Sequence, residues 1–255
     1  MLTFGQGKIL SPRIVKTVTR AVPKLESTVV HSGVQPLLLA NGLALIFDLD
    51  GVIVNSMPVH ELSWARYLDS IGLQVPDMIQ RMHGRRNDQI FRDFLGPDPS
   101  DQEIHAHGSA KEQLFRDMIQ PQLSNYIVPG VIDLLQRTQH IPVGLASNAE
   151  RPNVDFVLDQ AGVRRHFQVI VDGARVDHPK PAPDVYLRAA ELLNTEPRNC
   201  IVFEDSPVGV AAARAAGARV VGIQTQTQFL ADVELAIPDF RAPQLMEYLE
   251  QQGKR

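Results

Sequence analysis

Two aspartates separated by one residue give this sequence its clearest chemical signal. Asp48 and Asp50 follow the apolar run 43–47, and Gly51 ends that run. Side chains alternate between the two faces of a strand, so both carboxylates leave the strand end on the same side. One of them can attack a substrate or bind a metal while the other transfers protons. A plain Asp-Gly turn after a core strand is the alternative interpretation.

A hydroxyl and an amide follow a second apolar run. Ser147 and Asn148 come directly after residues 143–146. A hydroxyl beside backbone N–H groups at the start of a helix is suited to holding an anion. Capping of the following helix explains the same two residues equally well.

Lys180 lies between two prolines, Pro179 and Pro181. The prolines keep the backbone extended and limit how far the lysine can withdraw into solvent. An ammonium group held in this way can offset the charge of a carboxylate or a phosphate. An exposed loop lysine is the alternative.

Adjacent carboxylates follow a further apolar run. Glu204 and Asp205 come after residues 200–203. Two such groups side by side raise one another's pKa, and a divalent cation removes the conflict. Oxygen ligands of this kind suit Mg²⁺. Solvated loop acids are the alternative, which the preceding apolar strand disfavours.

The elements that must position these residues alternate between strand and helix. The pattern predicts strands at 142–146, 169–171, 200–203 and 219–223, and helices at 131–138, 153–160, 182–193, 208–216 and 242–251. Elements of these lengths imply right-handed crossovers and a parallel sheet covered by helices on both faces. In such a sheet, ligands bind in the crevice outside the carboxyl ends of the strands. The fold class is therefore α/β, with a doubly wound parallel sheet.

A different pattern interrupts this core after its first strand. Residues 58–71 predict one helix, and residues 77–126 are helical throughout, with a capping box at Ser100 and Glu103. We therefore expect a helical cap at 58–128, inserted into an α/β catalytic core formed by 42–57 and 129–255. The polar tract 224–228 is interpreted as a surface loop rather than part of a site.

The first 41 residues are basic and lie outside this pattern. A transit-type or membrane-surface segment has such a composition, and a loosely ordered extension or a start upstream of the true first strand are the other interpretations. We expect a poorly ordered N-terminal extension over residues 1–41.

The composition excludes several classes of function. A net charge of −4 gives no electrostatic footprint for nucleic acid or an anionic membrane, so we expect neither as a partner. The single cysteine, Cys200, excludes an internal disulfide and fits a reducing compartment, which favours a cytoplasmic location. We also expect a monomer.

Four segments together resemble the haloacid dehalogenase superfamily, and more narrowly its β-phosphoglucomutase and sugar-phosphate phosphatase branch. They are residues 47–52, 146–148, 180–183 and 204–209, which read FDLDGV, ASN, KPAP and EDSPVG. The resemblance covers roughly residues 43 to 223. It implies a Rossmann-like core with a helical cap between the first and second motifs.

The resemblance also implies roles for the residues of these motifs. Asp48 is expected to be the nucleophile that forms an aspartyl-phosphate, and Asp50 the acid and base. True dehalogenases of this type lack the second aspartate, so carbon–halogen chemistry is not expected. Charge on the phosphate would be stabilised by Ser147, Asn148 and Lys180. Mg²⁺ would be held by Asp48, the backbone carbonyl of Asp50, Asp205 and, through a water, Glu204.

The cap is expected to set the substrate. His60 matches a histidine linked to lid closure in mutase relatives, and a helix-surface role is its alternative. Arg85, Arg86 and Asn87 match the substrate loop, where two arginines can clamp an anionic group. The mutases usually place an arginine at the position of Asn87, so this residue argues against mutase activity.

We therefore predict a Mg²⁺-dependent phosphatase acting on small phosphorylated metabolites, in particular sugar phosphates. A sugar phosphomutase using the same aspartyl-phosphate is the alternative. A binding or regulatory module is a third interpretation, which the four intact motifs disfavour.

Overall fold

A computed structural model describes residues 37, 42–82, 85–226 and 229–252 of this chain, and these residues belong to one compact unit. The extension predicted over residues 1–41 lies outside the described residues, apart from Leu37. Leu37 is buried, and its backbone N–H donates to the carbonyl of Arg137 at 3.1 Å.

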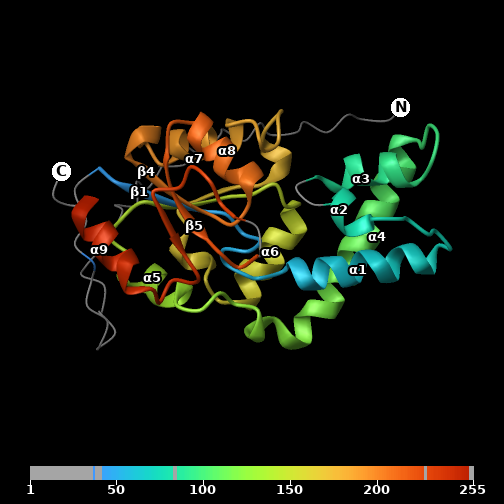
Figure 1. The fold of residues 1–255 in the computed structure, drawn as a ribbon, viewed down its shortest axis with the longest axis horizontal. Coiled ribbons are helices and arrows are strands. Elements are labelled where there is room, and N and C mark those ends of the chain that lie inside the picture. The colour runs from blue at the N-terminus through green and yellow to red at the C-terminus, as the bar shows by residue number, and fades with distance from the viewer. Residues whose placement is uncertain (1–36, 38–41, 83–84, 227–228, 253–255) are drawn as a thin grey trace, which may run out of the picture. The chain divides into compact units, whose positions relative to one another are not determined.

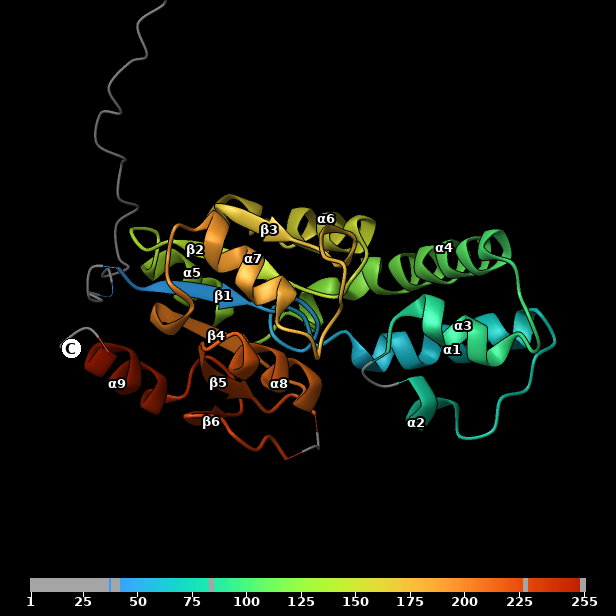
Figure 2. The ribbon, with the colours of Figure 1, turned by 90° about the horizontal axis from the view of Figure 1, so that it is seen from above.

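The described part of the chain contains one sheet of six parallel strands, and Figure 1 shows this sheet with helices above and below it. The strand order is β3-β2-β1-β4-β5-β6, as labelled in Figure 2. The strands are β1 (Ala44–Phe47), β2 (Val143–Ala146), β3 (Val169–Val171), β4 (Cys200–Glu204), β5 (Arg219–Ile223) and β6 (Leu235–Ile237). The chain moves outward from β1 through β2 to β3 and then returns to place β4 on the other side of β1. The predicted α/β fold class is confirmed, and the carboxyl ends of β1 and β4 meet where the strand order reverses.

Helices cover both faces of this sheet because the strand residues are apolar on both sides. Leu45 and Phe47 pack in one core with α5 (Val131–Arg137), α6 (Arg151–Gln160) and α9 (Pro243–Gln252). Ala44 and Ile46 pack in the other core with α7 (Asp184–Leu192) and α8 (Pro207–Ala215). Continuous apolar strands of this kind belong to buried parallel sheets. Short 3-10 helices complete the unit at Gln120–Asn125 (η1), Arg164–His166, Gly173–Arg175 and Pro197–Asn199.

A helical insertion separates β1 from β2. It consists of α1 (Met57–Ser70), α2 (Met78–Met82), α3 (Asn87–Phe94), α4 (Asp101–Ile119) and η1. Its own apolar core centres on Trp64, whose ring lies 4.7 Å from that of Phe91. Helices α1 to α4 lie beyond the carboxyl end of β1 (Figure 2). The division at residues 58 and 128 into a cap and a core domain stays a prediction.

The two linkers to this insertion are hydrogen-bonded to each other. Val54 and Ile127 form an antiparallel bridge. The N–H of Asn55 donates to the carbonyl of Tyr126 at 2.7 Å, and the N–H of Val128 donates to that of Ile53 at 3.1 Å. The chain therefore enters and leaves the insertion at one place.

One element of the sheet is missing from the sequence-based prediction. β6 has three residues, and the same stretch has a proline at position 238 and acidic residues on the preceding side. β3 is equally short, but its run Val-Ile-Val is β-branched throughout, whereas the run Leu-Ala-Ile of β6 has one β-branched residue and gives a weaker strand signal. None of the helices within the described ranges is long and apolar enough to cross a membrane.

Candidate active site

Asp48 and Asp50 directly follow β1 at the carboxyl edge of the sheet. The N–H of Asp48 donates to the carbonyl of Phe203 in β4 at 3.1 Å, which joins the two strand ends. Gly51 then turns the chain with a φ of +76°. A Cβ at this glycine would lie 1.8 Å from Oδ2 of Asp205. Glycine is thus required both for the turn and for the approach of Asp205.

Lys180 is buried beside the first of these aspartates. Its Nζ lies 2.6 Å from Oδ1 of Asp48 and 2.6 Å from Oε1 of Glu204. The backbone N–H of Lys180 donates to Oδ1 of Asn148 at 3.1 Å. The side chain is 6% exposed, so the alternative of an exposed loop lysine is wrong. Asn148 fixes the loop that carries this lysine.

Glu204 is fully engaged by its neighbours. Its Oε1 accepts from Lys180 and, at 2.8 Å, from the hydroxyl of Tyr186. Its Oε2 accepts from the N–H of Ser206 at 3.0 Å. A Cβ on Gly209 would lie 1.7 Å from Oε1. These contacts make Glu204 the anchor of Lys180, while its predicted role as a water-mediated metal ligand stays a prediction.

Two residues of the polar tract after β5, Thr225 and Gln226, contact this site, so the interpretation that the tract lies outside the site is wrong for them, whereas residues 227 and 228 lie outside the described residues. Nε2 of Gln226 donates to Oδ2 of Asp205 at 2.5 Å. The hydroxyl of Thr225 donates to the carbonyl of Gly51 at 2.8 Å. Both contacts join residues far apart in sequence, and the tract carries no local spacing that predicts them.

Two carboxyl groups of this site, those of Asp48 and Asp205, carry raised pKa values. Burial raises the pKa of Asp48 to about 7 against the lowering effect of Lys180, and the charge of Glu204 adds to the increase. Burial and the charges of Glu204 and Asp48 raise the pKa of Asp205 well above its ordinary value. Lys180 therefore offsets only part of the negative charge gathered here.

This donor set fits a hard divalent cation. Asp48 and Asp205 supply carboxylate oxygens, and the backbone carbonyl of Asp50 follows the same strand end. Gly51 leaves the space in which the Asp205 carboxylate lies. Within the described ranges, no three His, Cys, Asp or Glu side chains form a metal-binding group by themselves. The predicted set has two direct side-chain ligands, Asp48 and Asp205, and one backbone ligand, so this finding does not conflict with it.

Ser147 and Asn148 lie at the end of β2, as the sequence predicts. The N–H of Ser147 donates to the carbonyl of Val171 at 3.0 Å, and its Oγ accepts from the N–H of Ala149 at 3.1 Å. The oxygen of Ser147 thus closes a local turn, and its hydroxyl proton remains available to an anion. Ser147 does not cap α6, whose N-cap residue is Glu150, so the capping interpretation is wrong and the anion-binding interpretation stays a prediction.

Asp50 faces the helical insertion. Its Oδ1 accepts from the hydroxyl of Ser56 at 2.5 Å and lies 3.6 Å from Nε2 of His60. Burial favours the protonated carboxyl, but the interactions with His60 and Ser56 outweigh it and lower the pKa of Asp50. His60 also stacks on Phe115 with ring centroids 3.7 Å apart. It is therefore not the helix-surface histidine of the alternative interpretation.

A buried polar chain continues from His60, and sequence reasoning missed it. Nδ1 of His60 lies 3.0 Å from Nζ of Lys111, which lies 2.8 Å from Oε1 of Glu112. Oε2 of Glu112 accepts from Nδ2 of Asn153 in α6 at 2.5 Å, and Oδ1 of Asn153 accepts from Arg116 at 2.7 Å. The insertion and the sheet domain are thus joined by side chains as well as by the linkers.

The three predicted residues of the substrate loop differ in their contacts. Arg85 donates to Oδ2 of Asp93 at 2.9 Å, and Arg86 lies 3.3 Å from Oδ1 of Asp88. Asn87 begins α3, and its side-chain amide donates to the carboxylates of Glu112 and Glu150. Gly84, which belongs to the same predicted motif, lies outside the described residues.

Two cavities meet at this site. The core-side cavity measures about 330 Å³ and is lined by the four motifs, including Asp48, Ser147, Lys180 and Asp205. The cap-side cavity measures about 800 Å³ and is lined mainly by the insertion. Both are lined by Asp50, Met57, Arg85, Asn148 and Ala149, so the two cavities adjoin.

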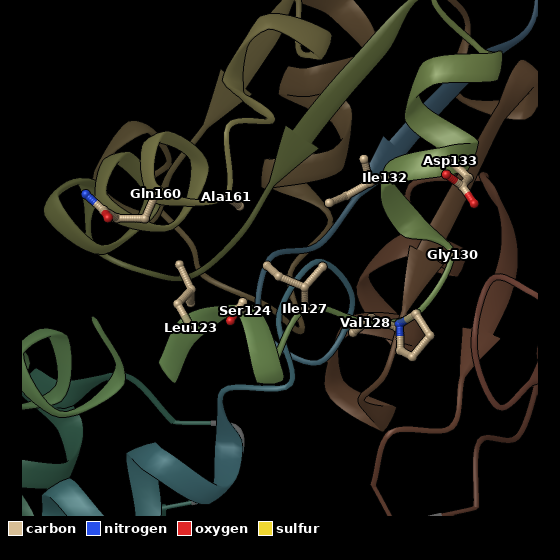
Figure 3. A pocket seen from close by; sticks show the side chains of 10 residues that line it. Leu123, Ser124, Ile127, Val128, Gly130, Ile132, Asp133, Gln160 and Ala161 are labelled. Atoms are coloured by element: carbon tan, nitrogen blue, oxygen red, sulfur yellow. The ribbon is translucent and has the colours of Figure 1, made fainter. Parts of the chain in front are cut away.

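A third cavity of about 390 Å³ lies at the second linker (Figure 3). Leu123, Ile127 and Ile132 supply much of its apolar wall. It contains none of the predicted site residues and is not part of the candidate active site.

Comparison with known proteins places the chain in a family. Residues 43–217 match the model of the haloacid dehalogenase-like hydrolases. The protein CbbY of Rhodobacter capsulatus is 33% identical over 214 residues, which cover 79% of this chain and 93% of that protein. Fructose-1-phosphate phosphatase YqaB of Escherichia coli is 31% identical over 182 residues, covering 71% and 95%.

A solved structure agrees with these matches. β-Phosphoglucomutase from Clostridium difficile superposes with a TM-score of 0.72 at 26% identity, covering 83% of this chain and 96% of that one. The chain belongs to the haloacid dehalogenase-like hydrolases, as its four motifs predict. It is an enzyme, and its relatives support phosphatase or phosphomutase activity.

Proposed function

We propose that this enzyme is a Mg²⁺-dependent phosphatase that hydrolyses small phosphate monoesters, in particular sugar phosphates, through an aspartyl-phosphate. The observation that carries this proposal is the meeting of Asp48, Asp50 and Lys180 in one cavity at the carboxyl ends of β1 and β4. The similarity to a fructose-1-phosphate phosphatase supports the same class of substrate.

In the first step, a carboxylate oxygen of Asp48 bonds to phosphorus while the bond from phosphorus to the alcohol oxygen breaks. Asp50 must be protonated for this step, although its pKa is lowered before substrate binds, and it gives its proton to the alcohol oxygen. In the second step, water attacks phosphorus and Asp50 takes a proton from the water. The bond from phosphorus to the Asp48 oxygen breaks, which restores the Asp48 carboxylate and releases inorganic phosphate. Ser56 and His60 hold the Asp50 carboxyl in place through both steps.

Positive charge must accompany these steps because an anion attacks an anion. Lys180 lies 2.6 Å from Asp48 and is held there by Glu204, so it is placed to stabilise the phosphoryl oxygens together with Ser147 and Asn148. Asp48, Asp205 and the carbonyl of Asp50 would hold the metal. When bound, Mg²⁺ would offset the charge of the carboxylates and the phosphate.

A sugar phosphomutase is the second candidate, favoured by the superposition on β-phosphoglucomutase. Both reactions share every residue of the core-side cavity and differ in what takes the phosphoryl group from Asp48: water or a second sugar hydroxyl. Asn87, in place of the arginine that the mutases usually carry, favours the phosphatase.

The proposal further includes a monomer that acts in the cytoplasm on a small phosphorylated metabolite, with no nucleic-acid or membrane partner. The modest net charge supports the absence of a nucleic-acid or membrane partner, and the single cysteine supports the cytoplasmic location.

The test follows β-glucose 1-phosphate turnover with Mg²⁺, with and without glucose 1,6-bisphosphate, measuring inorganic phosphate and glucose 6-phosphate separately. We expect inorganic phosphate without isomerisation, lost after chelation of the metal and restored by added Mg²⁺. Glucose 6-phosphate that appears only with the bisphosphate would identify a mutase. If neither product forms, a panel of other sugar and polyol monophosphates follows under the same conditions.

A further inference from the structure

The far wall of the cap-side cavity gathers carboxylates around one amide. Nδ2 of Asn87 lies 2.6 Å from Oε1 of Glu112 and 3.1 Å from Oε1 of Glu150. Glu112 belongs to α4 in the insertion, whereas Glu150 directly precedes α6 in the sheet domain. A substrate group that reached Asn87 would therefore meet two carboxylates, of which Glu112 is ion-paired with Lys111 and Glu150 is exposed.

The positive charges of this wall are already matched. The four arginines that line the cavity each contact a carboxylate: Arg85 with Asp93 at 2.9 Å, Arg86 with Asp88 at 3.3 Å, Arg92 with Asp101 at 2.5 Å, and Arg151 with Asp155 at 2.8 Å. An incoming phosphate would have to compete with these carboxylates for each arginine.

Glu112 is the member of this group that is built in most firmly. It is 3% exposed, and it accepts from Lys111, Asn87 and Asn153. Burial opposes its charge, but Lys111 and His60 outweigh burial and lower the pKa of Glu112 to about 2. The charge of Lys111 is therefore used within the protein rather than offered to a ligand.

We propose that Glu112, with Asn87 and Glu150, is a specificity-determining residue that restricts the enzyme to monophosphates whose remainder is uncharged and rich in hydroxyl groups. This inference rests on the proposed phosphatase reaction, which places the phosphate in the core-side cavity. Carboxylate oxygens accept hydrogen bonds from hydroxyls, and they repel a second phosphate. Such a site selects the monophosphate partly by weakening the binding of a bisphosphate.

The test compares two ligands that differ in one phosphate. Binding of fructose 1-phosphate and fructose 1,6-bisphosphate to the Asp48→Asn protein with Mg²⁺ is measured by calorimetry, so that neither ligand is consumed. We expect the monophosphate to bind at least about tenfold more tightly, because one unfavourable charge contact suffices for such a ratio. Equal binding, tighter bisphosphate binding or no monophosphate binding would overturn the inference.

The role of Glu112 is then tested by Glu112→Gln in the same background. We expect the preference for the monophosphate to fall by about threefold to tenfold, chiefly because the bisphosphate binds more tightly. Asp117→Asn on the exposed side of the same helix removes an equal charge and should leave the ratio unchanged. A Glu112→Gln protein that loses both ligands equally would show that the residue is only structural.

Glu150→Gln provides a second variant because this residue is exposed and its replacement does not disturb a buried network. It should shift the ratio in the same direction by a smaller factor, and an unchanged ratio in both glutamine variants would overturn the proposal. Phosphate release by the wild-type enzyme is measured separately. No release with the binding preference intact would overturn the phosphatase proposal but not this inference.

Discussion

The core-side and cap-side cavities handle charge in opposite ways. In the core-side cavity, Asp48, Lys180, Glu204 and Asp205 are almost completely buried, and the carboxylates outnumber the lysine that contacts them. In the cap-side cavity, the arginines are partly exposed and each contacts at least one carboxylate. The first arrangement leaves an excess of negative charge, which a divalent metal can offset. The second leaves little excess positive charge, and so it suits a neutral group better than a charged one.

The difference also concerns what fixes each arrangement. The core-side residues follow strands whose register sets their positions, and two glycines make room for their carboxylates. The cap-side residues come from separate helices and meet through side-chain contacts. We therefore expect substitutions in the core-side cavity to affect rate and folding strongly, and those on the cap side to have smaller effects.

The largest effect is expected for Asp48→Asn. The amide cannot form the acyl-phosphate bond, so kcat should fall by at least about 10³-fold. Phosphate release and circular dichroism are measured together, because the fold should be retained. Activity within tenfold of the wild type would contradict the assignment of the nucleophile.

The second-largest effect on kcat is expected for Lys180→Met. Loss of one electrostatic partner typically lowers kcat by about 10²-fold to 10³-fold. The change also leaves Asp48 and Glu204 without their shared cation, and breaking a buried ion pair in this way costs about 3–5 kcal/mol in the free energy of unfolding. Urea unfolding of this variant and the wild type measures the second effect. A variant that stayed fully stable would show that Glu204 does not depend on this lysine.

A matched pair of helical glycines compares the two cavities directly. Gly209→Ala places a Cβ against Glu204, and overpacking of this kind destabilises by about 1–3 kcal/mol. At Gly108 in α4, the nearest atom to the new Cβ is Cβ of Asn87 at 3.9 Å. Gly108→Ala should therefore stabilise the protein by up to about 1 kcal/mol, as alanine does in a helix interior. Thermal unfolding of both variants checks the contrast, which equal shifts would contradict.

An effect on stability rather than on turnover is expected for Asn153→Ala on the cap side. The variant removes the amide that links Glu112 to Arg116 and leaves their polar groups unsatisfied, which costs about 1–3 kcal/mol. Turnover should change by less than tenfold because no residue of the core-side cavity is altered. A larger loss of kcat than in Lys180→Met would place this link within the catalytic machinery.

The sequence was informative where function depends on local order along a strand. Asp48 and Asp50 share one strand end, and an apolar run marks that strand without any knowledge of the rest of the fold. The fold class followed in the same way, because alternating runs of strand and helix length leave few arrangements other than a parallel sheet. Lys180 was selected on a local signal too, since the prolines on both sides constrain its backbone.

Contacts that depend on tertiary structure could not be predicted in this way. Glu112 lies in an ordinary helical stretch, and its partners Asn87 and Asn153 are 25 and 41 residues away. Gln226 lies in a tract with no periodic pattern and reaches Asp205 only because β4 and β5 are neighbours. No spacing within one segment encodes either contact.

The paired linkers have a consequence for how this enzyme can be altered. Asn55 and Tyr126 are hydrogen-bonded neighbours, so the chain leaves the sheet domain for the helical insertion and returns to it at the same place. Removing residues 57–125 and closing the gap with a short turn would require little displacement of either end, since the ends already meet. A different insertion grafted at the same two residues would leave Asp48, Lys180 and Glu204 in place, but it would have to supply its own partner for Asp50, because His60 belongs to the segment removed.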